Sequence, residues 1–233
     1  MVQNVKKLFF GKPEHNTAIK HSILNNQRKS LKLIWENENY NDTGLERIFR
    51  LFLIVIQFVF PGIYISEIFA RKGLTYKNLA IELYLLIKLL FPILVFICHG
   101  KHNPVLLGLS IYFVSETITY VASLVFTSDL NYETRSPNRV ILLLFLNYIE
   151  ISFQFSVLYA GFDMLSSSAV TAIDFIYFSL ITSASIGFGD IHPVTQAGKL
   201  LVCCQSFLLL VFVVLFFNYF NSKRLDHRKQ TFK

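Results

Sequence analysis

The chain has 233 residues, of which 53% are hydrophobic and 16% are charged, whereas roughly 25% of the residues in soluble domains are charged. This composition excludes an ordinary soluble globular protein. The net charge of +7 comes from Lys and Arg residues that gather in the tails and short loops, a distribution typical of membrane topology, so we expect no nucleic-acid partner. Cys98, Cys203 and Cys204 form no Cys-x-x-Cys pair, which supports neither a zinc site nor a disulfide framework.

Residues 1–46 are polar, rich in Asn and Lys, and show no secretory signal pattern. They predict a cytoplasmic N-terminal tail with room for one short helix. The basic residues of this tail favour a solvated segment, and contact with anionic membrane lipid is the alternative. A cytoplasmic regulator is a possible partner, which the sequence does not identify.

The tail is followed by apolar runs of about 20 residues, long enough to cross the ~30 Å hydrocarbon core of a bilayer. The first run is interrupted by Pro61 and Gly62. The last run contains no charged residue and is the clearest transmembrane helix. The runs are residues 48–70, 79–98, 104–126, 140–159 and 200–220.

The segment 161–197 is too polar for a further span and too apolar for a plain loop. Thr171 and Asp174 have the spacing of a capping box, which predicts a helix of about a dozen residues and therefore ~18 Å, about half the thickness of the membrane. The helix must end before Gly187 and Gly189, because glycine permits backbone conformations closed to other residues. A half-helix followed by an extended return predicts a re-entrant loop, which membranes tolerate where it is buried or lines a watery path.

The residues after this half-helix are Ser185, Ile186, Gly187, Phe188, Gly189 and Asp190. This motif resembles Thr-Val-Gly-Tyr-Gly-Asp, the selectivity-filter signature of the potassium channel family, and the resemblance covers roughly residues 140–220. It implies an all-α membrane protein with a potassium-channel-like pore module (outer helix, re-entrant pore helix and filter, inner helix) preceded by two or three additional membrane helices. The implied boundaries are 1–46 for the tail, 47–127 for the N-terminal membrane helices, 139–221 for the pore module and 222–233 for a basic cytoplasmic tail.

The resemblance also implies the roles of the site residues. The backbone carbonyls from Ser185 to Gly189 and the Ser185 hydroxyl would replace the water shell of K⁺, and Thr171, Asp174 and Asp190 would support the filter. Ile186 and Phe188 would pack outward against the pore helix. Ser in place of Thr and Phe in place of Tyr remove packing and hydrogen-bonding groups, so the rigidity of the filter is the property that these departures affect. No cofactor is implied beyond permeant K⁺ ions.

Charged residues set the expected topology. With the loop entering from outside, Arg135, Arg139 and the basic C-terminal tail lie inside, in agreement with the positive-inside rule. This agreement fails at residues 48–70, since a full span there would place the basic N-terminal tail outside. We therefore favour an interfacial or re-entrant hairpin broken at Pro61 and Gly62, with a full span as the alternative.

Two charged residues lie deep in neighbouring spans. Lys88 and Glu116 are equally far along the chain from residue 102, the centre of the expected hairpin, so we expect them at equal depth and paired as a structural ion pair, with a gating role as the second interpretation. Glu150 has no partner that the sequence identifies, and protonation is one way to neutralise it. On the last span, Phe212, Phe216 and Phe217 predict either packing against lipid and neighbouring helices, which we prefer, or an apolar constriction.

These observations predict a potassium-selective channel subunit that acts as a homotetramer in the plasma membrane and conducts K⁺ passively. No span carries Arg or Lys at every third position, so we expect no strong voltage sensor. The alternatives are a weakly selective cation channel and a non-conducting membrane sensor or scaffold that uses the same pore module. An enzyme is disfavoured because no span offers a Ser-His, Cys-His or paired-carboxylate arrangement.

Overall fold

The structure, a computed structural model, describes residues 22–36, 44–127 and 137–231, with side chains described as far as residue 220. These residues form helices and no strand, as predicted for an all-α membrane protein, and a single isolated antiparallel bridge joins Leu165 to Pro193. The helices are α2 (Ile23–Glu36), α3 (Leu45–Gln57), α4 (Pro61–Ala70), α5 (Leu74–Ile97), α6 (Pro104–Phe126), α7 (Pro137–Gly161), α8 (Ala172–Ser183) and α9 (Gln196–Thr231).

Four of the described helices are long and apolar enough to cross a membrane, namely α5, α6, residues 138–161 of α7 and residues 196–220 of α9. The pair α3 and α4 passes the same test of composition but is bent by 65°. Pro61 stands at the first turn of α4, where its missing N–H and fixed φ start a new helix and prevent α3 from continuing. The predicted interruption of the first run is therefore present, as either a broken span or a re-entrant loop.

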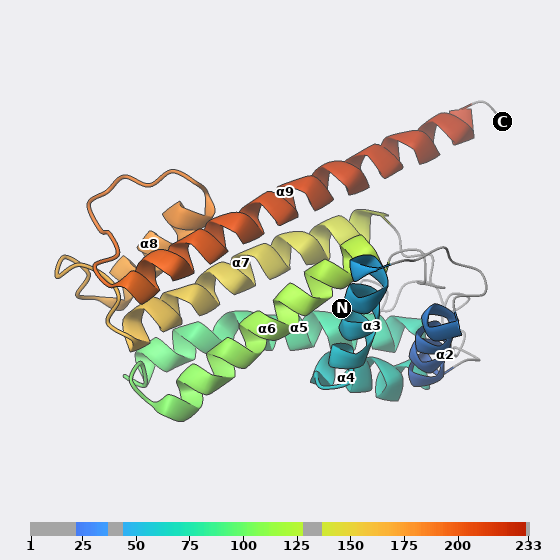
Figure 1. Cartoon of the computed structure of the whole chain (residues 1–233), viewed down its shortest axis with the longest axis horizontal. Helices are drawn as coiled ribbons and strands as arrows, with labels where there is room; N and C mark the ends of the chain where they lie inside the picture. Colours follow the sequence, from blue (N-terminus) through green and yellow to red (C-terminus); the bar gives the residue numbers. More distant parts are fainter. Residues whose placement is uncertain (1–21, 37–43, 128–136, 232–233) are drawn as a thin grey trace, which may run out of the picture. The chain divides into compact units, whose positions relative to one another are not determined.

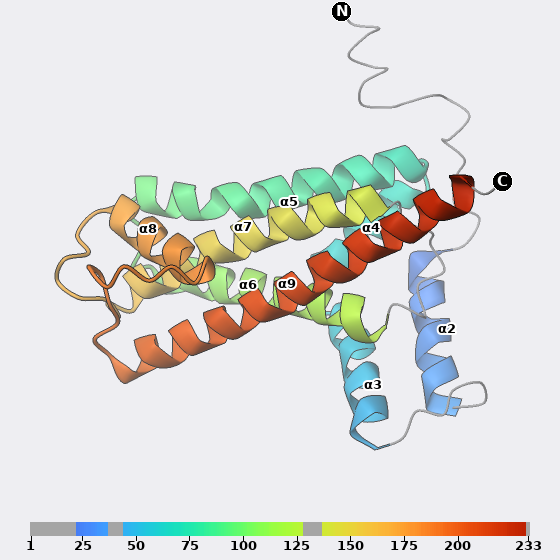
Figure 2. The ribbon, with the colours of Figure 1, turned by 90° about the horizontal axis from the view of Figure 1, so that it is seen from above.

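The chain divides into two compact units. The first contains residues 1–86 and 122–132, and in it α2 lies beside α3 (Figure 2). Ile34 of α2 and Ile54 of α3 form the buried core of this contact. The carboxylate of Glu67, on α4, accepts hydrogen bonds from the first backbone N–H groups of α2, at Ile23 (2.6 Å) and Leu24 (3.2 Å).

The other end of α2 is held in a similar way. The guanidinium of Arg47, on α3, donates hydrogen bonds to the carbonyls of Ile34 (3.2 Å) and Trp35 (2.5 Å). A carboxylate at the N-terminus and a guanidinium at the C-terminus match both the unsatisfied backbone groups and the dipole of the helix. Each end of α2 is therefore fixed by a different helix of the bent pair.

The second unit contains residues 87–121 and 133–233, and α7, α8 and α9 contact one another within it (Figure 1). The short helix α8 lies at one end of α7 and α9. In α7, 61% of the apolar stretch is buried, against 17% in α9, so α7 is the central helix of this group and α9 keeps most of its apolar surface exposed. Thr195 starts α9 by accepting a hydrogen bond from the Gly198 N–H through its hydroxyl oxygen (3.0 Å).

Candidate functional site

The helix α8 begins where the spacing of Thr171 and Asp174 predicts. The Asp174 carboxylate accepts hydrogen bonds from the Thr171 N–H (2.7 Å), the Val170 N–H (2.9 Å) and the Thr171 hydroxyl (2.9 Å). These hydrogen bonds, with the Thr171 N–H as the largest contribution, hold the pKa of Asp174 below its usual value. The capped helix has 12 residues and ends at Ser183. The C-terminal end of α8 therefore lies directly before the motif of residues 185–190. The helix dipole is negative at that end and favours cations.

The backbone of the motif alternates in handedness. Ser185, Gly187 and Gly189 have positive φ angles of 54°, 57° and 85°, whereas Ile186 and Phe188 do not. Backbone that alternates in the sign of φ can direct successive peptide groups toward one side. The positive φ angles at alternate residues are therefore compatible with the row of carbonyl ligands that the sequence predicts.

The side chains between these positions are exposed in the single chain. Ile186 is 56% exposed and Phe188 is 69% exposed. We expected both to pack against the pore helix, and the structure of one chain does not show that packing. Most of the surface of these two apolar side chains is therefore uncovered in the single chain.

A polar side chain that the sequence analysis did not single out lies behind the motif. Gln205, on α9, is 3% exposed, and its amide nitrogen lies within hydrogen-bond distance of the Ser179 carbonyl (2.9 Å), the Ser179 hydroxyl (2.9 Å) and the Ser183 hydroxyl (2.6 Å). Its amide oxygen accepts a hydrogen bond from the Tyr159 hydroxyl of α7 (2.7 Å). One side chain thus joins α7, α8 and α9.

The last turn of α8 is also held directly by α7. The Tyr148 hydroxyl donates to the Ser183 carbonyl (2.6 Å), and the hydroxyls of Ser152 and Ser183 are 2.8 Å apart. The Ser179 hydroxyl donates to the Ser152 carbonyl (2.5 Å). Because Ser183 is two residues before Ser185, these contacts fix the point from which the motif leaves the helix.

Serines on the segment before α8 hold the far end of the motif. The Ser168 hydroxyl donates to the Asp190 carbonyl (3.3 Å), and the Ser166 N–H donates to the His192 carbonyl (2.9 Å). Desolvation raises the pKa of Tyr177 on α8, and the nearby Asp190 carboxylate raises it further. The Asp190 backbone is therefore held by the segment before α8, and its role in supporting the filter stays a prediction.

The structure brings Lys88 of α5 and Glu116 of α6 together, with the Lys88 Nζ 3.3 Å from a Glu116 carboxylate oxygen. Glu150 of α7 belongs to the same cluster, because its Oε1 lies 3.7 Å from the Lys88 Nζ. The Thr117 hydroxyl accepts a hydrogen bond from Lys88 (2.7 Å) and donates one to the Glu150 Oε2 (2.7 Å). The sequence identified no partner for Glu150, and the structure places it beside Lys88 and Thr117, so that the expected pair is part of a cluster of three ionisable residues.

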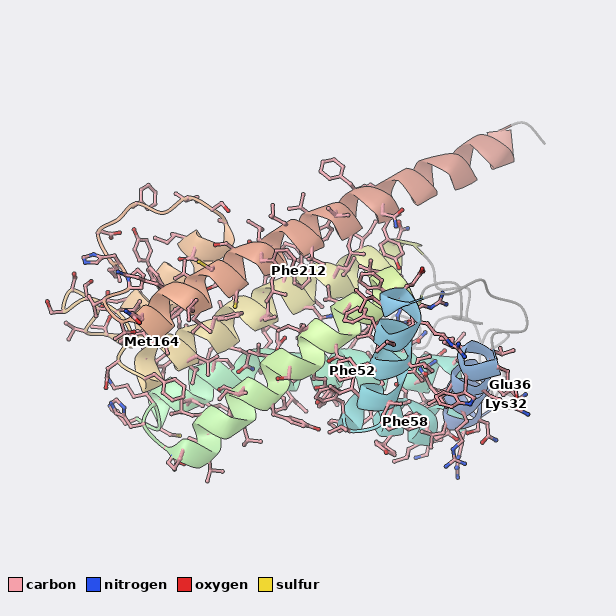
Figure 3. The ribbon with its side chains drawn as sticks, viewed as in Figure 1. Lys32, Glu36, Phe52, Phe58, Met164 and Phe212 are labelled. Carbon is pink, nitrogen blue, oxygen red and sulfur yellow. The ribbon has the colours of Figure 1, made fainter. Side chains whose placement is uncertain are left out.

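The aromatic residues of α9 differ in their surroundings. Phe212 is 1% exposed and lies between α9 and α7, with its ring edge-to-face against Tyr148 at 5.6 Å between centroids (Figure 3). A side chain so buried within one chain packs against a neighbouring helix, as the preferred interpretation states, and does not form a constriction. Phe217, at 68% exposed, faces away from the rest of the chain.

Comparisons with known proteins find similar proteins that are ion channels. Residues 141–223 match the model of a family described as Ion channel. The chain is 29% identical over 97 residues to potassium voltage-gated channel subfamily A member 5 of Mus musculus, a match that covers 39% of this chain and 16% of the relative. It is 38% identical over 50 residues to two pore potassium channel b of Oryza sativa subsp. japonica, covering 21% of this chain and 14% of the relative.

A shorter match joins the chain to potassium channel K1 of Plasmodium berghei (strain Anka), with 42% identity over 41 residues, 18% of this chain and 2% of the relative. No solved structure matches the chain. The chain thus covers at most 16% of the length of these relatives. The matches show that residues 141–223 are similar to a family of ion channels and that parts of the chain are similar to potassium channels.

Proposed function

We propose that the chain is a potassium-selective channel subunit that conducts K⁺ passively through a pore formed by four copies. The observation that carries this proposal is the positive φ at Ser185, Gly187 and Gly189, a pattern that supports a row of backbone carbonyls along one side of this segment. A dehydrated cation needs oxygen ligands on all sides, and one strand offers them on one side only. Four such strands around an axis complete the coordination shell.

Exposed apolar surface supports assembly with further copies. Ile186 and Phe188 are uncovered in the single chain, and α9 carries an exposed apolar stripe at the three- and four-residue spacing of one helix face. This stripe consists of Leu200, Phe207, Leu210, Val214 and Phe217. A stripe of this kind suits packing against the same helix of another copy or against lipid.

Topology and gating complete the proposal. In this proposal both ends of the bent pair α3 and α4 lie on the cytoplasmic side, which makes the basic N-terminal tail cytoplasmic in agreement with the positive-inside rule. The membrane that we propose for the protein is the plasma membrane. None of the spans repeats a basic residue at every third position, which supports a channel without a strong voltage sensor.

The test is the current of the purified protein in a planar bilayer with potassium on one side and sodium on the other. A reversal potential near the potassium equilibrium potential is the expected result. A reversal potential near zero would indicate a weakly selective cation channel, and the absence of current would indicate a non-conducting sensor or scaffold.

Two glycine substitutions tie the current to the motif. Gly189→Ala introduces a Cβ at φ +85°, in a region that L residues rarely adopt, and should abolish conduction while the protein still inserts and assembles. Gly108→Ala is the matched control, because an added Cβ there meets nothing within 4 Å and Gly108 lies inside α6. Normal potassium current in Gly189→Ala would overturn the assignment of the filter.

A further inference from the structure

Three ionisable side chains meet in the interior of the second unit, away from the filter. Lys88, Glu116 and Glu150 come from α5, α6 and α7, and their exposed fractions are 3%, 8% and 0%. The Lys88 Nζ lies within 4 Å of both carboxylates. Each of the three residues stands near the middle of a helix long enough to cross the membrane.

The charges of this cluster do not balance. One ammonium faces two carboxylates, which leaves a net charge of −1 if both carboxyl groups are ionised. An uncompensated charge in a buried, low-dielectric site is strongly unfavourable, and two carboxylates that share a site normally retain a proton on one of them. The least costly state is the one in which the cluster holds a single additional proton.

The hydrogen bonds indicate where this proton resides. Glu150 Oε2 accepts a hydrogen bond from Thr117, whereas Glu150 Oε1 has no hydrogen-bond partner although the side chain is fully buried. Gln154, one turn further along α7 and also fully buried, has the same deficit at its Oε1, while its amide nitrogen donates to the Lys88 carbonyl (2.9 Å). A proton on Glu150 gives this fully buried carboxyl group a hydrogen to donate, and Gln154 Oε1 is a buried acceptor one turn away on the same helix.

The charged groups that act on Glu150 come from two neighbouring helices. Among the described residues they are Lys88 of α5 and Glu116 of α6, and the Tyr112 hydroxyl of α6 lies near Glu116. Phe113 of α6 places its ring 5.6 Å from the Lys88 Nζ, a distance at which a cation and an aromatic ring attract each other.

We propose that Lys88, Glu116 and Glu150 form a buried proton-binding site, in which one proton is held on Glu150 at neutral pH and the cluster as a whole is uncharged. The site binds a proton from water and releases the same proton, so no other reactant is involved. The inference rests on the charges and contacts of the second unit and does not depend on ion conduction.

Infrared spectroscopy of the full-length protein in lipid bilayers tests the proposal. At neutral pH the wild-type protein should show the carbonyl stretch of a protonated, water-shielded carboxylic acid, which shifts in D₂O. Glu150→Gln should remove this band. Glu116→Gln should remove it as well, because the remaining Glu150 then ionises beside Lys88. Asp163→Asn, which changes a carboxyl group that is 74% exposed, is the matched control and should leave the band unchanged.

A third variant tests the charge balance from the other side. Lys88→Met removes the positive charge, so both carboxyl groups should become protonated and the band should approximately double in area. If Lys88→Met does not fold, the two Glu→Gln variants decide the question alone, since each keeps the shape of its side chain. A wild-type spectrum without a band that Glu150→Gln removes would overturn the proposal, and so would a band that persists in either Glu→Gln variant.

Discussion

Replacing Gln205 with Leu removes the side chain that joins α7, α8 and α9 behind the filter. The two N–H hydrogens of the Gln205 amide are shared among three acceptors, and the Tyr159 hydroxyl donates to its oxygen, so the amide makes at most three hydrogen bonds at a time with these four groups. Interhelical hydrogen bonds in membrane proteins average about 0.6 kcal/mol each, which gives ~2 kcal/mol for the three. A loss of stability of the same size is expected from the Tyr159 hydroxyl, which loses its acceptor in this variant, because a buried donor left without an acceptor costs about 1–3 kcal/mol.

Equilibrium unfolding of the purified protein in mixed micelles measures this loss, with Cys204→Leu as the control because Cys204 is exposed and adjacent to Gln205. Tyr159→Phe should cost less than Gln205→Leu, and the double variant should lose less than the two single losses added together, by roughly 0.5 kcal/mol or more. Gln205→Leu within about 0.5 kcal/mol of the wild type, the range of ordinary surface substitutions, would refute the reasoning, as would strictly additive losses.

Other predictions concern the filter and its helix. Ser185→Ala should weaken the innermost ion site and lower the affinity for a blocker bound there, whereas Ser185→Thr keeps the hydroxyl and should keep that affinity. An unchanged blocker affinity in Ser185→Ala would show that Ser185 does not line the ion path. Exchanging potassium for sodium should lower the melting temperature of the assembled wild-type protein but not that of Gly189→Ala, since bound ions stabilise the folded state. An equal shift in both proteins would show that the stabilisation by potassium does not come from ions bound in the filter. Because the folded-state pKa of Asp174 is lowered, its contribution to stability is complete at neutral pH and is lost as the pH falls through that pKa. The difference in melting temperature between wild type and Asp174→Asn should therefore disappear in strong acid, and a difference that grows there would reverse the assigned sign.

Much of the second unit could be predicted because its signals are local in the sequence. The capping pair of Thr171 and Asp174 fixes the start of α8, and the glycines that follow limit its length. The meeting of Lys88 and Glu116 follows from a short turn between α5 and α6, because the constant rise of a helix then gives equal depth to residues equally far from that turn.

The contacts of Glu150 and Gln205 could not be predicted in this way. Neither α7 nor α9 has a distinct polar face, so the sequence pattern does not show where an individual polar side chain points. Glu150 is also separated from Glu116 by residues 128–136, whose length does not set the register of α7 against α6. The partners of Gln205 lie on α8 and α7, and only the packing of three helices brings them together.

The arrangement of α2 has a mechanical consequence for the bend between α3 and α4. Arg47 lies on α3 and Glu67 lies on α4, and each forms hydrogen bonds with a different end of α2. The three helices therefore form the sides of a triangle. The side made by α2 is about 20 Å long and nearly inextensible, because a helix has a fixed rise per residue. A triangle with three rigid sides has fixed angles. The 65° bend can therefore neither open nor close while both sets of hydrogen bonds are intact. Before the angle between α3 and α4 can change, Arg47 or Glu67 must release its end of α2.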